Sequence, residues 1–395
     1  MRFLTAGESH GIALNTIIEG VPAGLRLSES DIAGELGRRQ RGYGRGDRMK
    51  IETDRARILS GVRYGKTIGS PISLLLENKD WINWQKKMSI IEVDQPADLL
   101  QMPRPGHADF AGMVKYRHND LRNILERSSA RETAMRVAAG AVAKKLLKAF
   151  GIEVFGHVLQ IESISTCHSA LSLLQQRHSL EKWRHYMERV ENSSVACADA
   201  SAEEKMIARI ESARKTGDTL GGIFEVVAIG IPVGLGSHVH YDRKLDGLIA
   251  LAMMSINAIK SVEIGLGKDA ASLPGSEVHD EILPDKARTY YRPSNNAGGI
   301  EGGMSNGEPV VVRLAMKPIP TMSRPLRSID AGTLHPEKAF RERADVCAVP
   351  AAVVVAEAML ALVLADSLLQ KLGGDSVTEM KERFDELPQI PLERT

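Results

Sequence analysis

Two short segments hold a histidine in a setting suited to proton transfer. GESHG, residues 7–11, places a carboxylate, a hydroxyl and an imidazole between two glycines, and RPGHAD, residues 104–109, presents His107 after a proline and a glycine. Histidine ordinarily titrates near neutral pH, which suits an acid or a base. Because adjacent side chains on an extended segment point to opposite faces, Ser9 and His10 are expected to act separately rather than as a nucleophile and its base. A turn facing water and a purely structural histidine are the alternatives.

Five arginines fall between residues 38 and 48, interleaved with glycines in RRQRGYGRGDR. Guanidinium groups match carboxylate and phosphate in a two-pronged geometry, and glycines allow a loop to fold over a small polyanion. A solvated charged face and an RGG-like segment that contacts nucleic acid are alternative interpretations. The net charge is only +1 over 395 residues, so a broad basic surface is absent and a polyanionic metabolite is favoured.

Two further segments could bind anions. In ERSSARET, residues 126–133, serines and arginines precede an expected helix, whose N-terminus favours negative charge. An ordinary capped helix explains the same residues. The glycine-rich run AGGIEGGMSNGEP from residue 297 lacks both the P-loop and the dinucleotide-binding patterns, so it is only weak evidence for a phosphate site.

Local signals predict the elements that hold these segments. Residues 2–19 are predicted as strand, loop and strand, and Ser28 with Asp31 forms a capping box at the start of a helix. Further capping boxes are expected at Ser129 with Glu132, in a helix closed by Gly151, and in a helix that begins at Ser201 with Glu204. Other expected elements are hairpin strands over 57–78, strands over 152–164, 221–236 and 308–319, and helices over 242–260 and 349–369.

The order of these elements mixes helices and strands, and no repeat or long linker divides the chain. We therefore expect an α+β fold in a single large domain over residues 1–395, with a polar excursion at about 163–201. The three cysteines have no metal or disulfide spacing, so no metal site is predicted, and no signal peptide is visible; a cytoplasmic protein is expected. The apolar run from Val349 is interrupted by Glu357 and Asp366, which favours a core helix over a membrane span.

Taken together and in this order, GESHG, RRQRGYGRGDRMKIETD, RPGHAD, RSSARET, GGMSNG and RADVCAVP with AEAM behind it resemble the chorismate synthase family over nearly the whole chain. The resemblance implies a carbon-oxygen lyase of the shikimate pathway. It converts 5-enolpyruvylshikimate 3-phosphate into chorismate and phosphate by an anti 1,4-elimination, and it needs reduced FMN without net redox change. It also implies a β-α-β sandwich with internal pseudo-symmetry, assembled as a homotetramer.

The resemblance assigns roles to individual residues. His10 is implied as the acid that neutralises the leaving phosphate, His107 as the group beside the pyrimidine ring of the flavin, and Asp345 as the acceptor of a proton from the flavin's central ring. The implied substrate contacts are Ser9, Arg39, Arg45, Arg48, Arg104, Ser129 and Arg131. The implied flavin contacts are Arg127, Ser128, Ser129, Asn257, Ala258, Gly302, Lys317, Pro318, Ile319, Pro320, Thr321 and Arg343.

Two residues depart from the family pattern: Ala344 stands where serine or histidine is expected before Asp345, and Met304 stands where isoleucine is common. NADPH and an external flavin reductase are alternative sources of the reduced flavin. Two other functions are alternative interpretations of the sequence. A flavin-dependent oxidoreductase would consume one reductant per product, and a non-catalytic polyanion- or RNA-binding protein would show steeply salt-dependent binding.

Overall fold

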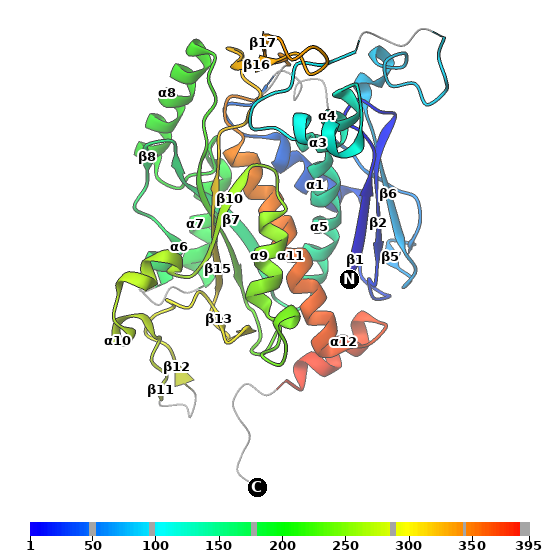
Figure 1. The fold of residues 1–395 in the computed structure, drawn as a ribbon. Helices are drawn as coiled ribbons and strands as arrows, with labels where there is room; N and C mark the ends of the chain where they lie inside the picture. The colour runs from blue at the N-terminus through cyan, green and yellow to red at the C-terminus, as the bar shows by residue number, and fades with distance from the viewer. Residues whose placement is uncertain (47–52, 95–98, 175–179, 285–289, 343–344, 388–395) are drawn as a thin grey trace.

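The structure, a computed structural model, describes residues 1–46, 53–94, 99–174, 180–284, 290–342 and 345–387. Two antiparallel sheets enclose a layer of helices (Figure 1). The first sheet has the order β1 (Arg2–Ala6), β2 (Ala13–Glu19), β6 (Ile72–Glu77), β3 (Arg57–Ile58); the second has the order β8 (Ile164–Ser165), β7 (Glu153–Ile161), β9 (Gly222–Ile229), β15 (Val310–Met316), β10 (Ile259–Ile264). Four helices fill the middle layer: α1 (Glu29–Gln40), α5 (Thr133–Lys148), α9 (Leu245–Met254) and α11 (Val349–Leu372).

The two halves of the chain repeat one order of elements. The first half runs β1, β2, α1, β3, β6, α5, and the second runs β7, β9, α9, β10, β15, α11, once the other elements between them, including α7 (Leu180–Asn192) and α8 (Ala200–Thr216), are set aside. In each half the sheet places its first, second, fourth and third strand side by side, and β8 adds an edge strand to the second sheet. The α+β class, the sandwich and its internal pseudo-symmetry are therefore confirmed.

Helix α11 is apolar almost all the way round because it is enclosed on nearly every side. It packs against α5, α1 and α9 within the helix layer and against β7 and β9 of the second sheet, with Val353, Leu360 and Leu364 at most 1% exposed. It is long and apolar enough to cross a membrane, but it is mostly buried inside the fold. The prediction of a core helix is correct.

One carboxylate lies at the centre of this layer. Glu357 of α11 is completely buried; its Oε1 accepts a hydrogen bond of 2.9 Å from Arg38 of α1, and its Oε2 binds Lys144 of α5 at 2.5 Å. Burial opposes ionisation of Glu357, but the charges of Arg38 and Lys144 prevail and lower its pKa to about 2. Three helices are therefore joined through one buried ionic group.

The variant Glu357→Gln is expected to lower the free energy of unfolding by about 3 kcal/mol at neutral pH, because two cations then lack their buried partner. The pKa of Glu357 lies below its ordinary 4.5, so its contribution is complete above that pH and disappears as the pH falls toward 2. Urea unfolding at several pH values measures both effects, with Glu382→Gln on the exposed face of α12 (Val377–Asp385) as the control. Equal stability of Glu357→Gln and the unsubstituted protein at neutral pH would contradict the prediction.

The expected capping boxes are correct in one case and wrong in two. Ser28 accepts from the backbone of Asp31, whose side chain accepts from the backbone of Ser28. The box at Ser129 is wrong because the Glu132 carboxylate binds Arg136 and Thr5 instead; a short 3-10 turn (η2, Ala130–Glu132) precedes α5.

The capping box expected at Ser201 is also wrong, although a helix does begin one residue earlier. Asp199 caps α8 (Ala200–Thr216) by accepting from the backbone N–H groups of Ser201 and Ala202. The helix expected over residues 242–260 is shorter as well. It ends at Met254, because Ala258 has a left-handed backbone with φ 65° and β10 begins at Ile259.

The polar excursion folds against the outer face of the second sheet. It contains β8, α6 (Ala170–Leu174) and α7 (Leu180–Asn192), and Trp183 and Tyr186 of α7 form a second buried cluster with Phe155 of β7.

The remaining strands are β4 (Val62–Arg63), β5 (Lys66–Thr67), β11 (Leu283–Pro284), β12 (Tyr290–Tyr291), β13 (Ile300–Glu301), β14 (Met304–Ser305), β16 (Arg327–Ile329) and β17 (Pro336–Lys338). The remaining helices are η1 (Lys79–Asn83), α3 (Asp109–Tyr116), α4 (Arg122–Ser128), η3 (Tyr241–Arg243), η4 (Gly267–Ser272) and α10 (Gly275–Val278).

Candidate active site

The segments with possible chemistry meet at one end of the sandwich. GESHG joins β1 to β2, the arginine-rich segment begins in the last turn of α1 and continues beyond it, and RPGHAD and RSSARET lie between β6 and α5. From the second half, Asn257 lies between α9 and β10, and residues 317–348 lie between β15 and α11. Pseudo-symmetry therefore brings equivalent loops of both halves to the same end, which is the upper end in Figure 1.

His10 is held by a buried glutamate that sequence reasoning did not single out. Its backbone N–H donates to Glu126 Oε2 at 2.8 Å, and its Nδ1 lies 3.0 Å from both carboxylate oxygens of Glu126. Burial opposes ionisation of Glu126, but the hydrogen bonds from His10 prevail and lower the pKa of the glutamate. Since an ionised carboxylate only accepts, Nδ1 of His10 carries a proton and Nε2 is left for another partner.

The turn that carries His10 is fixed from several sides. The imidazole stacks on Trp84, with ring centroids 3.9 Å apart, and Asn78 donates to the carbonyl groups of Glu8 and Gly11 at 3.1 and 2.9 Å. Gly7 has φ 107°, and a Cβ there would lie 2.4 Å from the carbonyl oxygen of Ala13, so only glycine fits. Ser9 and His10 consequently occupy a tight turn within the loop predicted between two strands, and the extended geometry assumed for this pair is wrong.

His107 is bound by a carboxylate in a similar way. Its Nδ1 lies 2.5 Å from Asp109 Oδ1, and Arg104 binds the same carboxylate through Nε at 2.8 Å and Nη2 at 3.1 Å. Burial opposes ionisation of Asp109, but the hydrogen bonds from His107 and Arg104 hold its pKa well below the ordinary value. The site thus contains two histidines, each bound through Nδ1 to a buried carboxylate that also binds an arginine.

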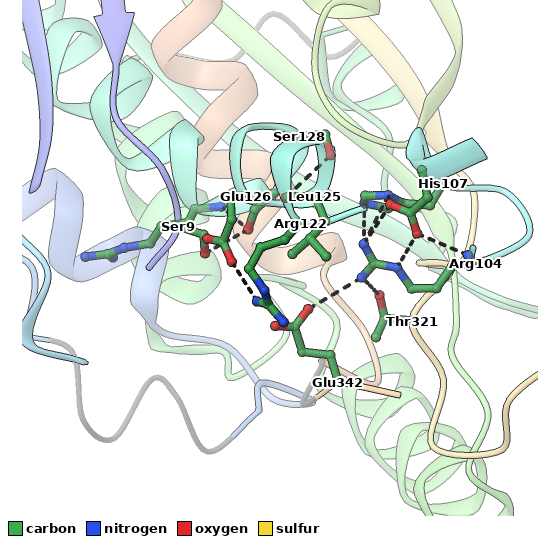
Figure 2. Close-up of polar contacts among 12 residues, drawn as sticks. Ser9, Arg104, His107, Arg122, Leu125, Glu126, Ser128, Thr321 and Glu342 are labelled. Atoms are coloured by element: carbon green, nitrogen blue, oxygen red, sulfur yellow. Dashed lines mark hydrogen bonds and ion pairs between the residues drawn. The ribbon is translucent and has the colours of Figure 1, made fainter. Parts of the chain in front are cut away.

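The two groups lie next to one another. Figure 2 shows Arg122 and Glu342 between Glu126 on one side and Arg104 on the other. Arg122 donates to Glu126 at 3.2 Å and its guanidinium lies 5.0 Å from the ring centre of Trp84, while Glu342 lies 3.6 Å from Arg104. Each of the two histidine groups therefore binds one further charged side chain, Arg122 at Glu126 and Glu342 at Arg104.

A group of buried or nearly buried arginines, Arg39, Arg45 and Arg131, here called the arginine pocket, is linked through Asn78 to the turn that carries His10. Arg39 and Arg131 are each 4% exposed, and both approach Asp54, at 3.6 Å from Arg39 and 2.6 Å from Arg131. Burial and the neighbouring charge of Arg45 lower the pKa of Arg39 to about 10. Nη1 of Arg39 makes no hydrogen bond among the described residues. Buried cations in this number favour an anionic ligand.

Two serines and one aspartate complete the contacts near this pocket. Ser129 Oγ donates to Ser9 Oγ at 3.2 Å, which joins the turn of His10 to the start of α5. Asp345 forms an ion pair of 2.8 Å with Arg45 and accepts from the backbone of Gly46 at 2.7 Å. Asp345 therefore lies beside an expected substrate arginine. The expected contacts Arg48 and Arg343, and the departure at Ala344, lie outside the described residues.

Most of the described residues expected to contact flavin are joined by hydrogen bonds into one group, here called the flavin wall. Arg127 donates to the carbonyl groups of Gly7 and Thr5, and Asn257 donates to the carbonyl of Ser128 at 3.1 Å. The carbonyl of Ala258 accepts from the backbone of Lys317, whose Nζ donates to Gly106 at 2.6 Å. Left-handed backbone at a residue other than glycine is strained, and at Ala258 that strain occurs where a ligand is expected.

The segment after Lys317 continues the wall. Thr321 Oγ1 accepts from Arg104 at 2.9 Å and the carbonyl of Ile319 accepts from Thr219 at 2.7 Å, so the stretch with Pro318 and Pro320 lies against the His107 group. Gly302 is not brought to this wall within one chain. It lies in the β13–β14 hairpin with Met304, and its neighbour Gly303 contacts the start of α9, whereas Asn257 follows the end of that helix.

Sequence reasoning missed five residues that fix this geometry: Glu126, Asp109, Asp54, Asn78 and Trp84. A local signal existed for three of them, because Glu126 begins ERSSARET, Asp109 ends RPGHAD and Asp54 ends RRQRGYGRGDRMKIETD. Asn78 and Trp84 lie outside these motifs, so only the fold reveals them. Among the described residues no group of three or more His, Cys, Asp or Glu side chains could hold a metal ion.

Comparison with known proteins shows which family the chain resembles. A sequence model of the family described as chorismate synthase matches residues 1–369. The chorismate synthase of Geobacter sulfurreducens is 56% identical over 397 residues, which cover 98% of each chain. That of Aquifex aeolicus is 55% identical over 98% of this chain and 97% of its own, and that of Bacillus pumilus is 52% identical over the full length of both.

A solved structure agrees over the same length. A crystal structure of chorismate synthase superposes with a TM-score of 0.78 at 47% sequence identity, and the match covers 98% of this chain and 96% of that one. The family model, the relatives and the solved structure each extend over nearly the whole chain, beyond the reach of any one motif. The protein therefore belongs to the chorismate synthase family.

Proposed function

We propose that this protein makes chorismate by releasing phosphate from 5-enolpyruvylshikimate 3-phosphate, with reduced FMN bound beside the substrate. The reaction class, a carbon-oxygen lyase of the shikimate pathway, follows from membership of the family. The observation that carries the proposal is the meeting of two carboxylate-bound histidines, a buried arginine pocket and the flavin wall at one end of the fold.

The arginine pocket suits a substrate with two carboxylates and a phosphate. Arg39, Arg45 and Arg131 supply three positive charges against the two of Asp54 and Asp345, so the pocket keeps a surplus charge that an anion neutralises. The hydroxyl groups of Ser9 and Ser129 add neutral donors beside these cations. Because these arginines are buried or nearly so, they are poorly placed to bind nucleic acid on the surface, which disfavours the RNA-binding alternative.

The histidines supply protons at defined atoms. In the reaction the C–O bond to phosphate and one C–H bond break while a ring double bond forms. With Nδ1–H bound to the Glu126 carboxylate, His10 acts as the acid in its doubly protonated form, whose second proton, at Nε2, goes to the departing phosphate. His107 borders the flavin wall through Arg104 and Thr321, and Asp345 accepts a proton on the side of the arginine pocket.

The residues of the wall fit a phosphorylated flavin. Arg127 and Lys317 offer cations, Ser128 and Ser129 offer hydroxyls, and Asn257 offers an amide, which together suit a phosphate and a polar ring edge. Reduced flavin, when bound, supplies electron density that assists the loss of phosphate. The protein's own residues hold it, exclude water and fix the protons.

The variant Glu126→Gln tests the orientation of His10. An amide presents either N–H or C=O to Nδ1, so the imidazole loses its fixed tautomer, and we expect kcat to fall about 10- to 100-fold. KM for the substrate is expected to change by less than about threefold, because the carboxylate of Glu126 binds His10 and Arg122, neither of which is an expected substrate-binding arginine. Steady-state kinetics with reduced FMN under anaerobic conditions measure both. A normal kcat would show that Glu126 has only a structural role.

The function itself is tested by incubating the protein anaerobically with reduced FMN and the substrate. Chorismate and phosphate in equal amounts over many turnovers, with the flavin still reduced, are expected of the lyase. Oxidation of one flavin per product would instead indicate an oxidoreductase. Bound FMN without product would indicate a binding protein.

Other properties belong to the same proposal. The flavin is FMN, and either NADPH acting on this protein or an external flavin reductase provides its reduced form; repeating the assay with oxidised FMN and NADPH separates the two.

The protein acts as a homotetramer in the cytoplasm without nucleic-acid or membrane partners. Light scattering after gel filtration tests the assembly. Among the described residues, Gly302 is an expected flavin contact that one chain does not bring to the wall, because it lies at the far end of α9 from Asn257.

A further inference from the structure

The arginine loop, defined here as residues 41–46 between α1 and the substrate pocket, is fixed on one side by the segment before α11. The carbonyl of Gly44 accepts from the backbone of Val346 at 2.8 Å, and Asp345 binds both Gly46 and Arg45. Gly44 has φ 91°, and a Cβ there would lie 3.1 Å from Cβ of Cys347. The loop therefore lies close against this segment.

On its other side the arginine loop contacts the end of the polar excursion. The backbone N–H of Tyr43 donates to the carbonyl of Ser194 at 2.7 Å. The guanidinium of Arg214 lies 5.6 Å from the ring centre of Tyr43, and a hydrogen bond with Glu211 raises the pKa of the Tyr43 hydroxyl. The excursion, for which the sequence suggested no role, thus reaches the arginine loop at Ser194.

Residues 193–197, here called the anchoring turn, are themselves held firmly. Glu203 of α8 accepts from both the backbone N–H and the hydroxyl of Ser194 at 2.8 Å each. The hydroxyl of Ser193 accepts from the backbones of Val195 and Cys197, and the carbonyl of Ala196 accepts from Val158 of β7 at 2.8 Å. The turn is therefore joined to both α8 and the second sheet.

We propose that the anchoring turn, held by Glu203, is a positioning element that keeps the arginine loop in place so that Arg45 and Asp345 face the substrate. The inference rests on the proposed roles of Arg45 and Asp345 in the reaction. Glu203 and Ser194 act through Tyr43 and touch no reacting atom.

The rest of the excursion has its own attachments, so the role of the turn can be tested separately. Glu225 of β9 accepts from the backbone of Ala170 at 2.7 Å and lies 3.2 Å from His157, which in turn binds the hydroxyl of Tyr186 at 3.0 Å. These buried contacts hold α6 and α7 on the sheet without Glu203. A change at Glu203 therefore acts on the turn and leaves the packing of the excursion in place.

The experiment compares Glu203→Ala, the conservative Glu203→Gln, and Glu204→Ala as a matched control on the exposed face of the same helix. Two measurements are made on each full-length variant. Limited trypsin digestion followed by mass spectrometry gives the rate of cleavage after Arg41 and Arg45, and anaerobic kinetics with reduced FMN give KM and kcat. The first measurement does not depend on the reaction.

Loss of two hydrogen bonds to a carboxylate is expected to raise the rate of cleavage within the arginine loop about tenfold in Glu203→Ala. KM for the substrate should rise by a similar factor, with a smaller change in kcat. Glu203→Gln keeps an oxygen acceptor and should restore most of both values, and Glu204→Ala should change neither. If Glu203→Ala melts more than a few degrees below the unsubstituted protein, Ser194→Ala replaces it, with an expected effect of about threefold on both measurements.

The outcomes separate the inference from the function on which it rests. Unchanged cleavage and unchanged KM in Glu203→Ala would overturn the anchoring role. Faster cleavage with unchanged KM would support the anchor and instead contradict the substrate role of Arg45. An equal rise of KM in Glu203→Gln and Glu203→Ala, with cleavage unchanged, would also overturn the inference, because the acceptor would then not matter.

Discussion

Replacing His10 with alanine or asparagine is expected to lower kcat by about 10²- to 10⁴-fold, the usual contribution of a positioned acid. The two variants differ usefully. Asparagine places its amide N–H where Nδ1 stands, so it keeps the hydrogen bond to Glu126 but has no proton to give at the position of Nε2. Both variants should therefore lose turnover to a similar extent if proton donation matters.

The fold should survive either change at His10. Glu126 stays paired with Arg122 at 3.2 Å, so no buried charge is left without a partner, and the expected flavin contacts come from other segments. FMN binding measured by fluorescence should remain close to that of the unsubstituted protein. Anaerobic kinetics with reduced FMN measure kcat. If asparagine at this position kept more than about half of the turnover, His10 would not be the acid.

Replacing Asp345 is expected to have an effect of similar size on turnover, with a second effect on binding. Asp345→Asn removes the charge, so kcat should fall about 10²- to 10⁴-fold if the carboxylate accepts a proton. Sequence resemblance alone suggests unchanged substrate affinity. The ion pair with Arg45 and the hydrogen bond from Gly46 lead us to expect, in addition, a KM several times higher.

Asp345→Ala separates the two tasks of this residue. Asparagine retains an oxygen that can accept from Gly46, whereas alanine removes both side-chain contacts with the arginine loop and leaves only its backbone bonds, such as those with Val346 and Ser194. KM should consequently rise further in the alanine variant, by about another tenfold, while kcat should be as low as in the asparagine variant. The same anaerobic kinetics measure both constants. A normal kcat with a raised KM in Asp345→Asn would make Asp345 an anchor of the loop and remove it from the chemistry.

Local sequence rules worked where one segment decides the outcome. Ser28 and Asp31 form their capping box because both partners lie within one turn of the same helix. The same rule failed at Ser129, where Arg136 and Thr5 compete for the Glu132 carboxylate, and at Ser201, where Asp199 binds the free N–H groups first. A local pattern does not reveal which other residues compete for the same hydrogen-bonding groups.

The pseudo-symmetric sandwich shows the same limit at the level of the fold. Strand and helix positions were mostly predictable from periodicity and glycine, but the strand order of each sheet was not. That order depends on pairings between distant segments, such as β2 with β6 and β9 with β15. The family resemblance supplied the sandwich, because many motifs in a fixed order identify a relative more reliably than periodicity identifies a topology.

The sequence by itself determined which side chains are available for chemistry: the two histidines, the arginines interleaved with glycine, and the aspartate of RADV. Only the tertiary structure decided that Glu126 holds His10, that Asp54 lies among the arginines, and that Ser194 reaches the arginine loop. The physical reason is distance along the chain. His10 and Glu126 are 116 residues apart and meet only because pairing of the strands and packing of the helices bring their loops to one end of the sandwich.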